Sequence, residues 1–481
     1  INQVINDIME EYDLKYDAAK ARVYNNGYKI YTTEDKDIQK RMEEEYLKDK
    51  YIDVATREEA KKGAHTQSGM VIIDHSSGQV VGCVGGLGKD SPTYGLNRAT
   101  STSSDGRQPG SSMKPLAAVA PGLEQGTITA STVYDDSSTV FGKDYKPHNS
   151  YSGGRGLITV RKAIEVSSNI VNVKILSNVG AQNSVDFLNE IGMTQLNEED
   201  AVLGLALGGV KHGVSPLQMA AGYAMIANKG EYIEPTFYTK VEDYQGTTIL
   251  EAKQEKKKVM SEGNAYILSS ILKSPVNGAS GTAYLCSISG MDVAAKTGTT
   301  DESKDRWLCG FTPYYAAATW FGYDLPERVY IPGMGNPAMN IWASIMDDIH
   351  EDLESARFEK PNNIVKAKIC LDSGRAATDE CKNTYTEEFV SGTVPGKCDG
   401  HKTVEICEET GKLATEYCPK TKKKTYLSTP EKEVNPSWKT SAGNKYQEIK
   451  DTCDKHTEET MSVKVENVVG KTEEEARKIL S

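Results

Sequence analysis

The sequence lacks a long hydrophobic run, a large basic block and the usual spacings of a metal site. No stretch of about 18 consecutive apolar residues occurs, so no segment is expected to cross a bilayer. Acidic residues outnumber basic ones by 68 to 56, for a net charge of −12, which argues against nucleic acid as the main partner. Neither a Cys-x₂-Cys pair nor a His-x₃-His pair is present, and we expect no cofactor and no metal.

The sequence also lacks an initiating methionine and a signal-peptide pattern, because it begins at Ile1. We therefore expect that the chain is part of a longer protein and that any membrane anchor lies outside it. Its 481 residues are too many for one ordinary core, and its apolar content of 38% is near the average of soluble globular proteins. About two to four folded domains are expected.

The order of predicted elements indicates an α+β fold for residues 65–360. We predict one antiparallel sheet assembled from both ends of this domain, with helices packed on it and an all-helical subdomain. Residues 1–64, with a strand at 28–33 and a helix from 35 to 47, are predicted to be a linker region. The other predicted elements are a β-hairpin at 70–86, helices at 111–125, 158–179, 183–192, 215–229 and 262–273, and strands at 293–299, 307–312 and 316–323.

The segment Ser111-Ser-Met-Lys114 carries the first candidate chemistry. Pro109-Gly110 precedes it, so Ser111 is expected at a helix start, with Lys114 one turn later on the same face. A lysine whose pKa is lowered by burial and by nearby cations can take the serine proton, and N–H groups at the helix start can stabilise an oxyanion. The pattern alone is weak, because Ser270-Ile-Leu-Lys273 repeats it.

The triplet Ser167-Ser168-Asn169 is the second candidate motif. Its first serine and its asparagine can point a hydroxyl and a carboxamide into one cleft. There the hydroxyl can relay a proton to a leaving amine, and the amide can hold a peptide carbonyl. On its own, such a triplet is more often a helix cap.

The third motif, Lys296-Thr297-Gly298-Thr299, falls on a predicted strand. A strand period of two places Thr297 and Thr299 on one face, where their hydroxyls can bind a carboxylate. Gly298 lets the backbone approach a substrate, and the Thr299 N–H can complete an oxyanion hole with that of Ser111. Lys296 would hold positive charge near the second motif.

The order Ser-x-x-Lys, Ser-x-Asn, Lys-Thr-Gly has the form of the β-lactamase and penicillin-binding motif set. The chain resembles the class A penicillin-binding proteins, D,D-transpeptidases of peptidoglycan synthesis, over roughly residues 1–360. The resemblance implies that Ser111 is the acylated nucleophile, that Lys114 is its general base, and that Ser167, Asn169, Lys296, Thr297 and Thr299 line the site. Ser270 is excluded as the nucleophile because no Ser-x-Asn lies between it and Lys296.

The same resemblance implies substrates and a location. The substrates would be peptidoglycan stem peptides ending in D-Ala-D-Ala, and β-lactam antibiotics would be covalent inhibitors. Cell-wall synthesis proteins are potential partners. The expected location is the extracytoplasmic face of a bacterial membrane, with the anchor and the glycosyltransferase domain of class A members lying outside this chain.

Two alternative functions stay open at this point. A serine β-lactamase needs a base for a deacylating water, and no Glu-x-x-Leu-Asn lies between Asn169 and Lys296. A β-lactam-sensing receptor would bind the drug without cross-linking peptides. The retained linker sequence argues against a receptor.

Six of the nine cysteines lie in residues 361–460, which we predict to be a module with an internal repeat. The segment from Cys370 to Cys381 matches that from Cys407 to Cys418. The repeat favours two local disulfides, Cys370–Cys381 and Cys407–Cys418, in a module with little core. Zinc bound by some of the six cysteines with His401 or His456 is the less favoured interpretation, because no Cys-x₂-Cys is present.

The end of the chain is strongly polar. Residues 421–460 are rich in Lys, Thr and Glu and are expected to be irregular. Residues 461–481, a short strand followed by a helix start, resemble the opening of a truncated PASTA repeat.

Overall fold

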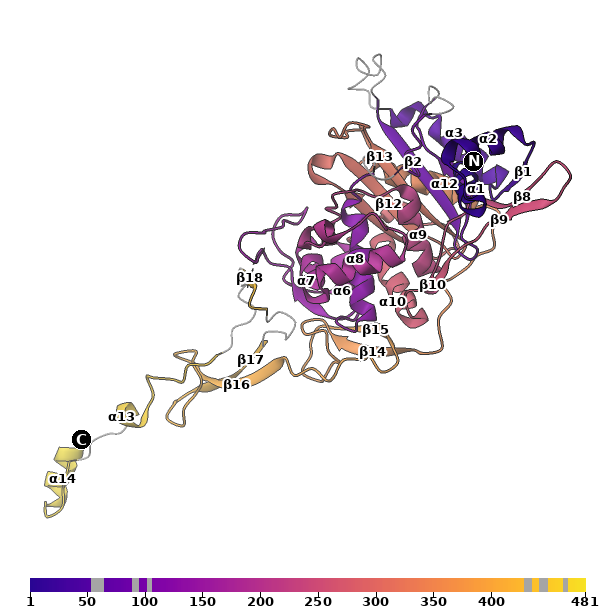
Figure 1. Cartoon of the computed structure of the whole chain (residues 1–481). Coiled ribbons are helices and arrows are strands. Elements are labelled where there is room, and N and C mark those ends of the chain that lie inside the picture. Colours follow the sequence, from indigo (N-terminus) through magenta and orange to yellow (C-terminus); the bar gives the residue numbers. More distant parts are fainter. Residues whose placement is uncertain (53–64, 89–94, 102–105, 428–434, 441–448, 462–465) are drawn as a thin grey trace.

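A five-stranded antiparallel sheet lies at the centre of the computed structural model, which describes residues 1–481 except 53–64, 89–94, 102–105, 428–434, 441–448 and 462–465. The strand order is β11-β12-β13-β2-β3, so β2 pairs with β13 although the two are far apart in the chain (Figure 1). The prediction of one sheet assembled from both ends of the domain is confirmed. The strands are β2 (Gln67–Asp74), β3 (Gln79–Val84), β11 (Ala294–Thr299), β12 (Asp305–Phe311) and β13 (Tyr315–Gly322).

The sheet is buried on both faces, because alternate side chains of its strands enter two different cores. In β2, Val71 and Ile73 pack into the core shared with the helix-rich subdomain, whereas Met70 and Ile72 pack into a second core. The first core includes α9 (Pro216–Ala227), and the second includes α3 (Lys36–Tyr46) and α12 (Pro337–Ile349). Helices therefore cover both faces, and the predicted α+β class is confirmed.

The helix-rich subdomain departs from the predicted helices at two places that matter for the site. The helix expected at 111–125 begins as a 3₁₀ turn over Gly110–Met113 and continues as a π-helical segment over Pro115–Val119. The helix expected at 158–179 is two helices, broken at residues 166–168. The subdomain contains α5 (Ala120–Glu124), α6 (Val160–Glu165), α7 (Asn169–Val179), α8 (Ala181–Glu190), α10 (Glu262–Leu272), α11 (Ser274–Asn277) and the short strands β4 (Val133–Asp135), β5 (Thr139–Phe141) and β6 (Leu157–Thr159).

The N-terminal segment pairs with a distant strand rather than standing apart. The predicted strand at 28–33 is β1 (Lys29–Thr32), which pairs with β8 (Tyr238–Glu242) in a three-stranded sheet. Asp35 caps the following helix α3 through its side chain. The remaining elements here are α1 (Asn2–Tyr12), α2 (Tyr16–Asn25), β7 (Glu231–Ile233), β9 (Thr248–Glu251) and β10 (Lys256–Lys258).

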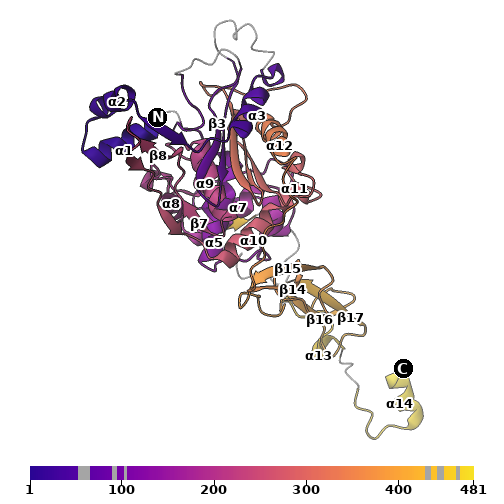
Figure 2. The same cartoon turned by 90° about the vertical axis from the view of Figure 1, so that its right-hand side faces the viewer.

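Two β-hairpins extend from the body toward the C-terminus (Figure 2). The first is β14 (Ile364–Cys370) with β15 (Thr384–Val390), and the second is β16 (His401–Cys407) with β17 (Thr421–Leu427). The expectation that residues 421–460 are irregular is therefore wrong for β17, which forms because it pairs along its whole length with β16.

Among the described residues beyond β17, a short strand returns to the body. Strand β18 (Trp438–Thr440) pairs with β5, and the Trp438 ring packs edge-on against Phe141 with 5.9 Å between ring centroids. The helices α13 (Glu458–Met461) and α14 (Glu473–Leu480) follow. The short strand expected before α14 falls partly outside the described residues.

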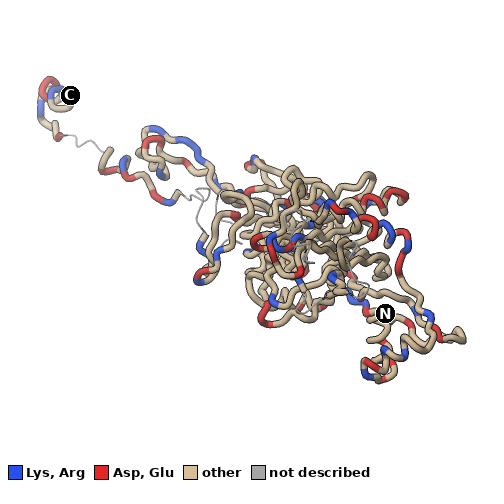
Figure 3. Tube along the Cα trace, turned by 90° about the horizontal axis from the view of Figure 1, so that it is seen from above, with Lys and Arg blue, Asp and Glu red and all other residues tan. Residues whose placement is uncertain are grey.

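Charge is distributed unevenly over the fold. The trace through the central body is mostly uncharged, whereas the N-terminal helices and the C-terminal extension carry acidic and basic residues side by side (Figure 3). Within the described ranges, no helix combines the length and the apolar content that a membrane span requires.

Candidate active site

Lys114 connects two of the predicted motifs. Its side chain is fully buried, and its Nζ donates to the Ser167 carbonyl oxygen at 2.7 Å, to Ser167 Oγ at 3.1 Å and to Asn169 Oδ1 at 2.6 Å. Ser111 lies one turn earlier in the 3₁₀ turn and is half-buried, and its carbonyl accepts from the Lys114 backbone N–H. The first two motifs therefore meet at one amine.

Ser167 is held in a strained backbone conformation at the break between α6 and α7. Its φ of 57° lies in the left-handed region, which a serine seldom adopts. The break arises because Ser168 is the N-cap of α7, with its hydroxyl accepting from the Val171 N–H. This geometry turns the Ser167 hydroxyl toward Lys114 and leaves Asn169 in the first turn of α7.

Lys296 brings in the third motif from strand β11. Its fully buried Nζ donates to Ser167 Oγ at 2.8 Å and to the Thr297 carbonyl at 3.0 Å. The Ser167 hydroxyl oxygen thus accepts from two amines, which occupies its two lone pairs. Its own hydrogen remains available for donation to a third group.

The close approach of the two lysines has an electrostatic consequence. Burial, and then the neighbouring charge of Lys296, hold the pKa of Lys114 well below its ordinary value of 10.5, while Asp136 acts in the opposite direction. Burial lowers the pKa of Lys296 to about 7. A neutral Lys114 amine donates only two of the three hydrogen bonds described above, and the lone pair that it gains allows it to act as a general base beside a serine.

Strand β11 lies directly against the turn that carries Ser111. A methyl group on Gly298 would lie 2.3 Å from the Pro109 carbonyl oxygen, and one on Gly110 would lie 2.6 Å from the Thr299 carbonyl oxygen. Only glycine at both positions allows this approach. The backbone of Thr299 and the turn that carries Ser111 are therefore neighbours, as a shared oxyanion hole requires.

The two threonines of the third motif differ in surroundings. Thr297 is half-buried and its hydroxyl donates to Thr282 Oγ1 at 3.0 Å, whereas Thr299 is exposed and its hydroxyl accepts from Arg306 at 3.2 Å. The guanidinium of Arg306 thus adds a positive charge beside Thr299. Neither Thr282 nor Arg306 was predicted from the sequence.

The second Ser-x-x-Lys pattern lies in a different setting. The Ser270 hydroxyl accepts from Arg161 Nη2 at 3.0 Å, and Lys273 forms an ion pair with Asp292 at 2.8 Å. Ser270 therefore has an arginine as its partner, and Lys273 has a carboxylate. Neither partner belongs to the group formed by Lys114, Ser167, Asn169 and Lys296.

A buried carboxylate supports the site and was also not predicted. Asp136 is fully buried and accepts hydrogen bonds from the hydroxyls of Ser168 and Tyr151, from Asn149 Nδ2 and from the Arg155 N–H. Through Ser168 it fixes the start of α7. The Asp135-Asp136 pair belongs to no motif, so only the three-dimensional arrangement identifies it.

Comparison with known proteins places this geometry in a family. A family model described as "Penicillin binding protein transpeptidase domain" matches residues 68–347, and one described as "Penicillin-binding protein 1A, C-terminal domain" matches residues 360–402. The first match contains all three motifs.

Curated relatives agree with these matches. Penicillin-binding protein 1A of Clostridium botulinum is 33% identical over 417 residues, covering 83% of this chain and 49% of the relative. That of Clostridium tetani is 33% identical over 423 residues, covering 83% of this chain and 53% of the relative. The chain thus spans about half the length of the curated relatives it matches.

Solved structures share the fold. Penicillin-binding protein 1A from Haemophilus influenzae has a TM-score of 0.66 at 20% identity, covering 82% of this chain and 77% of that one. The PonA1 protein from Mycobacterium tuberculosis, in complex with penicillin V, has a TM-score of 0.61 at 23% identity, covering 75% of this chain and 95% of that one.

Proposed function

The chain belongs to the penicillin-binding protein transpeptidase family, and from that premise we propose that it is a serine D,D-transpeptidase that cross-links peptidoglycan stem peptides. Ser111 would be the nucleophile, and Lys114, Ser167, Asn169 and Lys296 would be the other catalytic residues. Thr297, Gly298 and Thr299 would bind substrate. The observation that carries the proposal is the buried pair of lysines that share the Ser167 hydroxyl.

In the first step, Ser111 Oγ attacks the carbonyl carbon of the penultimate D-alanine while the neutral Lys114 amine takes the hydroxyl proton. The backbone N–H groups of Ser111 and Thr299 stabilise the oxyanion. The Ser167 hydroxyl delivers a proton to the departing amine and is reprotonated from Lys114. D-Alanine leaves, and an ester joins the peptide to Ser111.

In the second step, an amine from a neighbouring stem peptide attacks the ester carbonyl. The ester bond breaks, an amide bond forms, and the Ser111 oxygen recovers a proton that the amine gives up through the Lys114–Ser167 pair. The two half-reactions use the same groups in opposite directions, so ping-pong kinetics follow.

The third motif would orient the substrate. The terminal carboxylate of the stem peptide would lie against the hydroxyls of Thr297 and Thr299, near the charges of Lys296 and Arg306. The Asn169 carboxamide would hold a peptide group of the substrate. Substrate carboxylate would favour the charged form of Lys296, whose pKa is about 7 without it.

A β-lactam would acylate the same serine, which gives a direct test. We expect fluorescent penicillin to label the chain and Ser270→Ala, and to leave Ser111→Ala unlabelled. Ser270→Ala is the matched control, because it removes the serine of the other Ser-x-x-Lys pattern. Release of D-alanine from a D-Ala-D-Ala peptide by the same protein distinguishes an enzyme from a drug receptor, and slow loss of the label distinguishes it from a β-lactamase.

The proposal also implies a location and partners. Stem peptides are found outside the cytoplasmic membrane, so the chain would act at the extracytoplasmic face. Cell-wall synthesis proteins would be its potential partners, and residues 1–64 would connect it to a preceding domain. Residues 65–360 would be the catalytic domain, 361–460 an accessory module and 461–481 the start of a PASTA-like repeat.

A further inference from the structure

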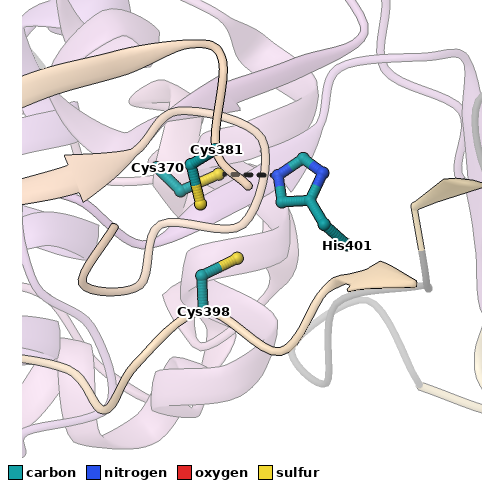
Figure 4. Close-up of side chains that lie close together, drawn as sticks. All are labelled: Cys370, Cys381, Cys398 and His401. Atoms are coloured by element: carbon teal, nitrogen blue, oxygen red, sulfur yellow. Dashed lines mark hydrogen bonds between the residues drawn. The ribbon is translucent and has the colours of Figure 1, made fainter. Parts of the chain in front are cut away.

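In the C-terminal extension, which follows residue 360, six cysteines and two histidines form two groups. One comprises Cys370, Cys381, Cys398 and His401, and the other comprises Cys407, Cys418, Cys453 and His456. Within each group the four ligand atoms all lie within 4.8 Å of one another. Figure 4 shows the first group, in which the three thiols and the imidazole point toward a common centre.

The separations suit a tetrahedral ion. Sulfur and nitrogen ligands at 2.3 and 2.0–2.1 Å from zinc would lie about 3.5 Å apart in a tetrahedral site. His401 Nε2 lies 3.1 Å from Cys370 Sγ, and His456 Nδ1 lies 3.4 Å from Cys407 Sγ and 3.5 Å from Cys453 Sγ. Three sulfurs and one imidazole are a ligand set typical of structural zinc sites.

The two groups share one arrangement of ligands along the chain, although His401 turns its Nε2 and His456 its Nδ1 toward the sulfurs. In both, the first cysteine ends a strand and the second lies eleven residues later. The third cysteine and the histidine form a Cys-x₂-His pair, Cys398-Asp-Gly-His401 and Cys453-Asp-Lys-His456. The third cysteine is hydrogen-bonded by its backbone N–H to the equivalent carbonyl, Ala376 at 2.7 Å and Leu413 at 2.8 Å.

Hydrogen-bond donors point at the sulfurs in both groups. The Thr378 N–H donates to Cys381 Sγ at 3.3 Å, and the Thr415 N–H donates to Cys418 Sγ at 3.3 Å. The hydroxyl of Ser373 donates to Cys398 Sγ at 3.1 Å, and that of Thr410 to Cys453 Sγ at 3.4 Å. Such donors stabilise thiolates, which are the form that binds a metal.

The second group also has an outer carboxylate. Glu409 Oε2 lies 3.1 Å from His456 Nε2, the ring nitrogen that faces away from the sulfurs. A carboxylate on the far nitrogen orients a metal-bound imidazole. Asp372 occupies the equivalent repeat position in the first group, but its Oδ2 lies 3.7 Å from His401 Nε2, the nitrogen that faces Cys370 Sγ, so the outer carboxylate is a feature of the second group.

Disulfides account poorly for the same groups. All nine cysteines lie within the described residues and are free thiols, so the structure contradicts the disulfides expected between Cys370 and Cys381 and between Cys407 and Cys418. One disulfide between two of the three cysteines in a group would leave the third thiol and the histidine without a role. The hairpins have few buried apolar side chains, such as Ile369, Phe389 and Ile406, and a metal would supply the missing stability.

We propose that residues 370–401 and 407–456 each bind one structural zinc ion through three cysteines and one histidine. Zinc content of the full 481-residue chain, purified without chelator and measured by inductively coupled plasma mass spectrometry, is expected to be about two per chain. Cys398→Ala and Cys453→Ala should each lower it to about one, and the double substitution to near zero. Cys286→Ala is the matched control, because Cys286 is a buried thiol outside both groups, and it should keep both ions.

Three further measurements keep the test decisive. Cobalt added to the apo chain should give the visible absorption of a tetrahedral thiolate complex, and all nine thiols should react after unfolding with chelator and without reductant. Fluorescent-penicillin labelling reports whether each variant has kept a folded catalytic domain. The proposal would be overturned if protein that penicillin labels contained no zinc after exposure to zinc. It would also be overturned if six of the nine thiols were lost to disulfides.

Discussion

Two buried lysines share one serine hydroxyl, and this arrangement fixes the protonation states on which the proposed chemistry depends. Lys114 and Lys296 both donate to Ser167 Oγ, at 3.1 and 2.8 Å. Two ammonium groups that contact the same hydroxyl oxygen inside the protein would repel each other strongly. Repulsion favours the neutral form of one of them, and Lys114 is the one whose pKa is lowered both by burial and by the charge of the neighbouring lysine.

Replacing Lys114 by arginine tests its role as a base. Arginine keeps the positive charge and cannot lose it, so it cannot accept the Ser111 proton. We expect Lys114→Arg to lower the rate of acylation by penicillin by about 10²–10⁴-fold. Stopped-flow fluorescence measures the rate, with Lys273→Arg as the control, because Lys273 belongs to the other Ser-x-x-Lys pattern. Equal rates for the two variants would show that Lys114 is not the base.

The pH dependence of acylation follows from the lowered pKa of Lys114. A base must be unprotonated, so the rate should rise with pH and level off once Lys114 has lost its proton. Because burial and Lys296 lower that pKa, the plateau should be reached well below pH 10.5. A rate that keeps rising up to pH 10.5 would mean that Lys114 has an ordinary pKa, and the proposed base would lack its physical reason.

At the scale of elements, the site depends on a strand lying against a turn without an intervening side chain. A methyl group on Gly298 would meet the Pro109 carbonyl, Trp307 Cβ at 2.7 Å and Ser112 Oγ at 2.9 Å. We expect Gly298→Ala to move β11 away from the turn that carries Ser111. The change should cost about 1–3 kcal/mol of folding free energy and most of the penicillin labelling.

The matched control is Gly335→Ala, whose added methyl would meet nothing within 4 Å. Urea unfolding and penicillin labelling of both variants provide the comparison. If Gly298→Ala behaved like Gly335→Ala, the close approach of β11 to the turn would be unimportant.

The two hairpins offer a second prediction at this scale. If zinc holds them, removing it with a chelator should make β17, which contains Lys422, Lys423 and Lys424, about tenfold more sensitive to trypsin. Penicillin labelling of Ser111 should not change, because neither zinc group includes a residue of the active site. Loss of labelling together with the metal would instead connect the hairpins to the active site.

At the scale of the whole molecule, the match to the penicillin-binding motif set predicted that the three segments meet, and spacing within each motif predicted its local geometry. Ser111 and Lys114 are one turn apart, Ser167 and Asn169 flank a helix cap, and Lys296 lies on a strand. The fold class followed from the order of predicted elements, with strands at both ends of the domain and helices between them.

What the sequence did not predict depends on contacts between distant segments. Asp136 supports Ser168 across the subdomain and belongs to no motif. Helix α12 was missed although the sequence carries signals for it: Asn336 caps its start, Pro337 is its first residue, and its buried apolar residues recur at helical spacing. The Cys-x₂-His pairs at 398–401 and 453–456 are visible in the sequence, but only the folded chain brings two further cysteines to each pair.

The most direct measurement is peptide mapping of the chain by mass spectrometry after exposure to penicillin. The account predicts one covalent adduct, on Ser111, in the wild-type chain. An adduct on Ser270 or on any other residue, with Ser111 unmodified, would contradict it.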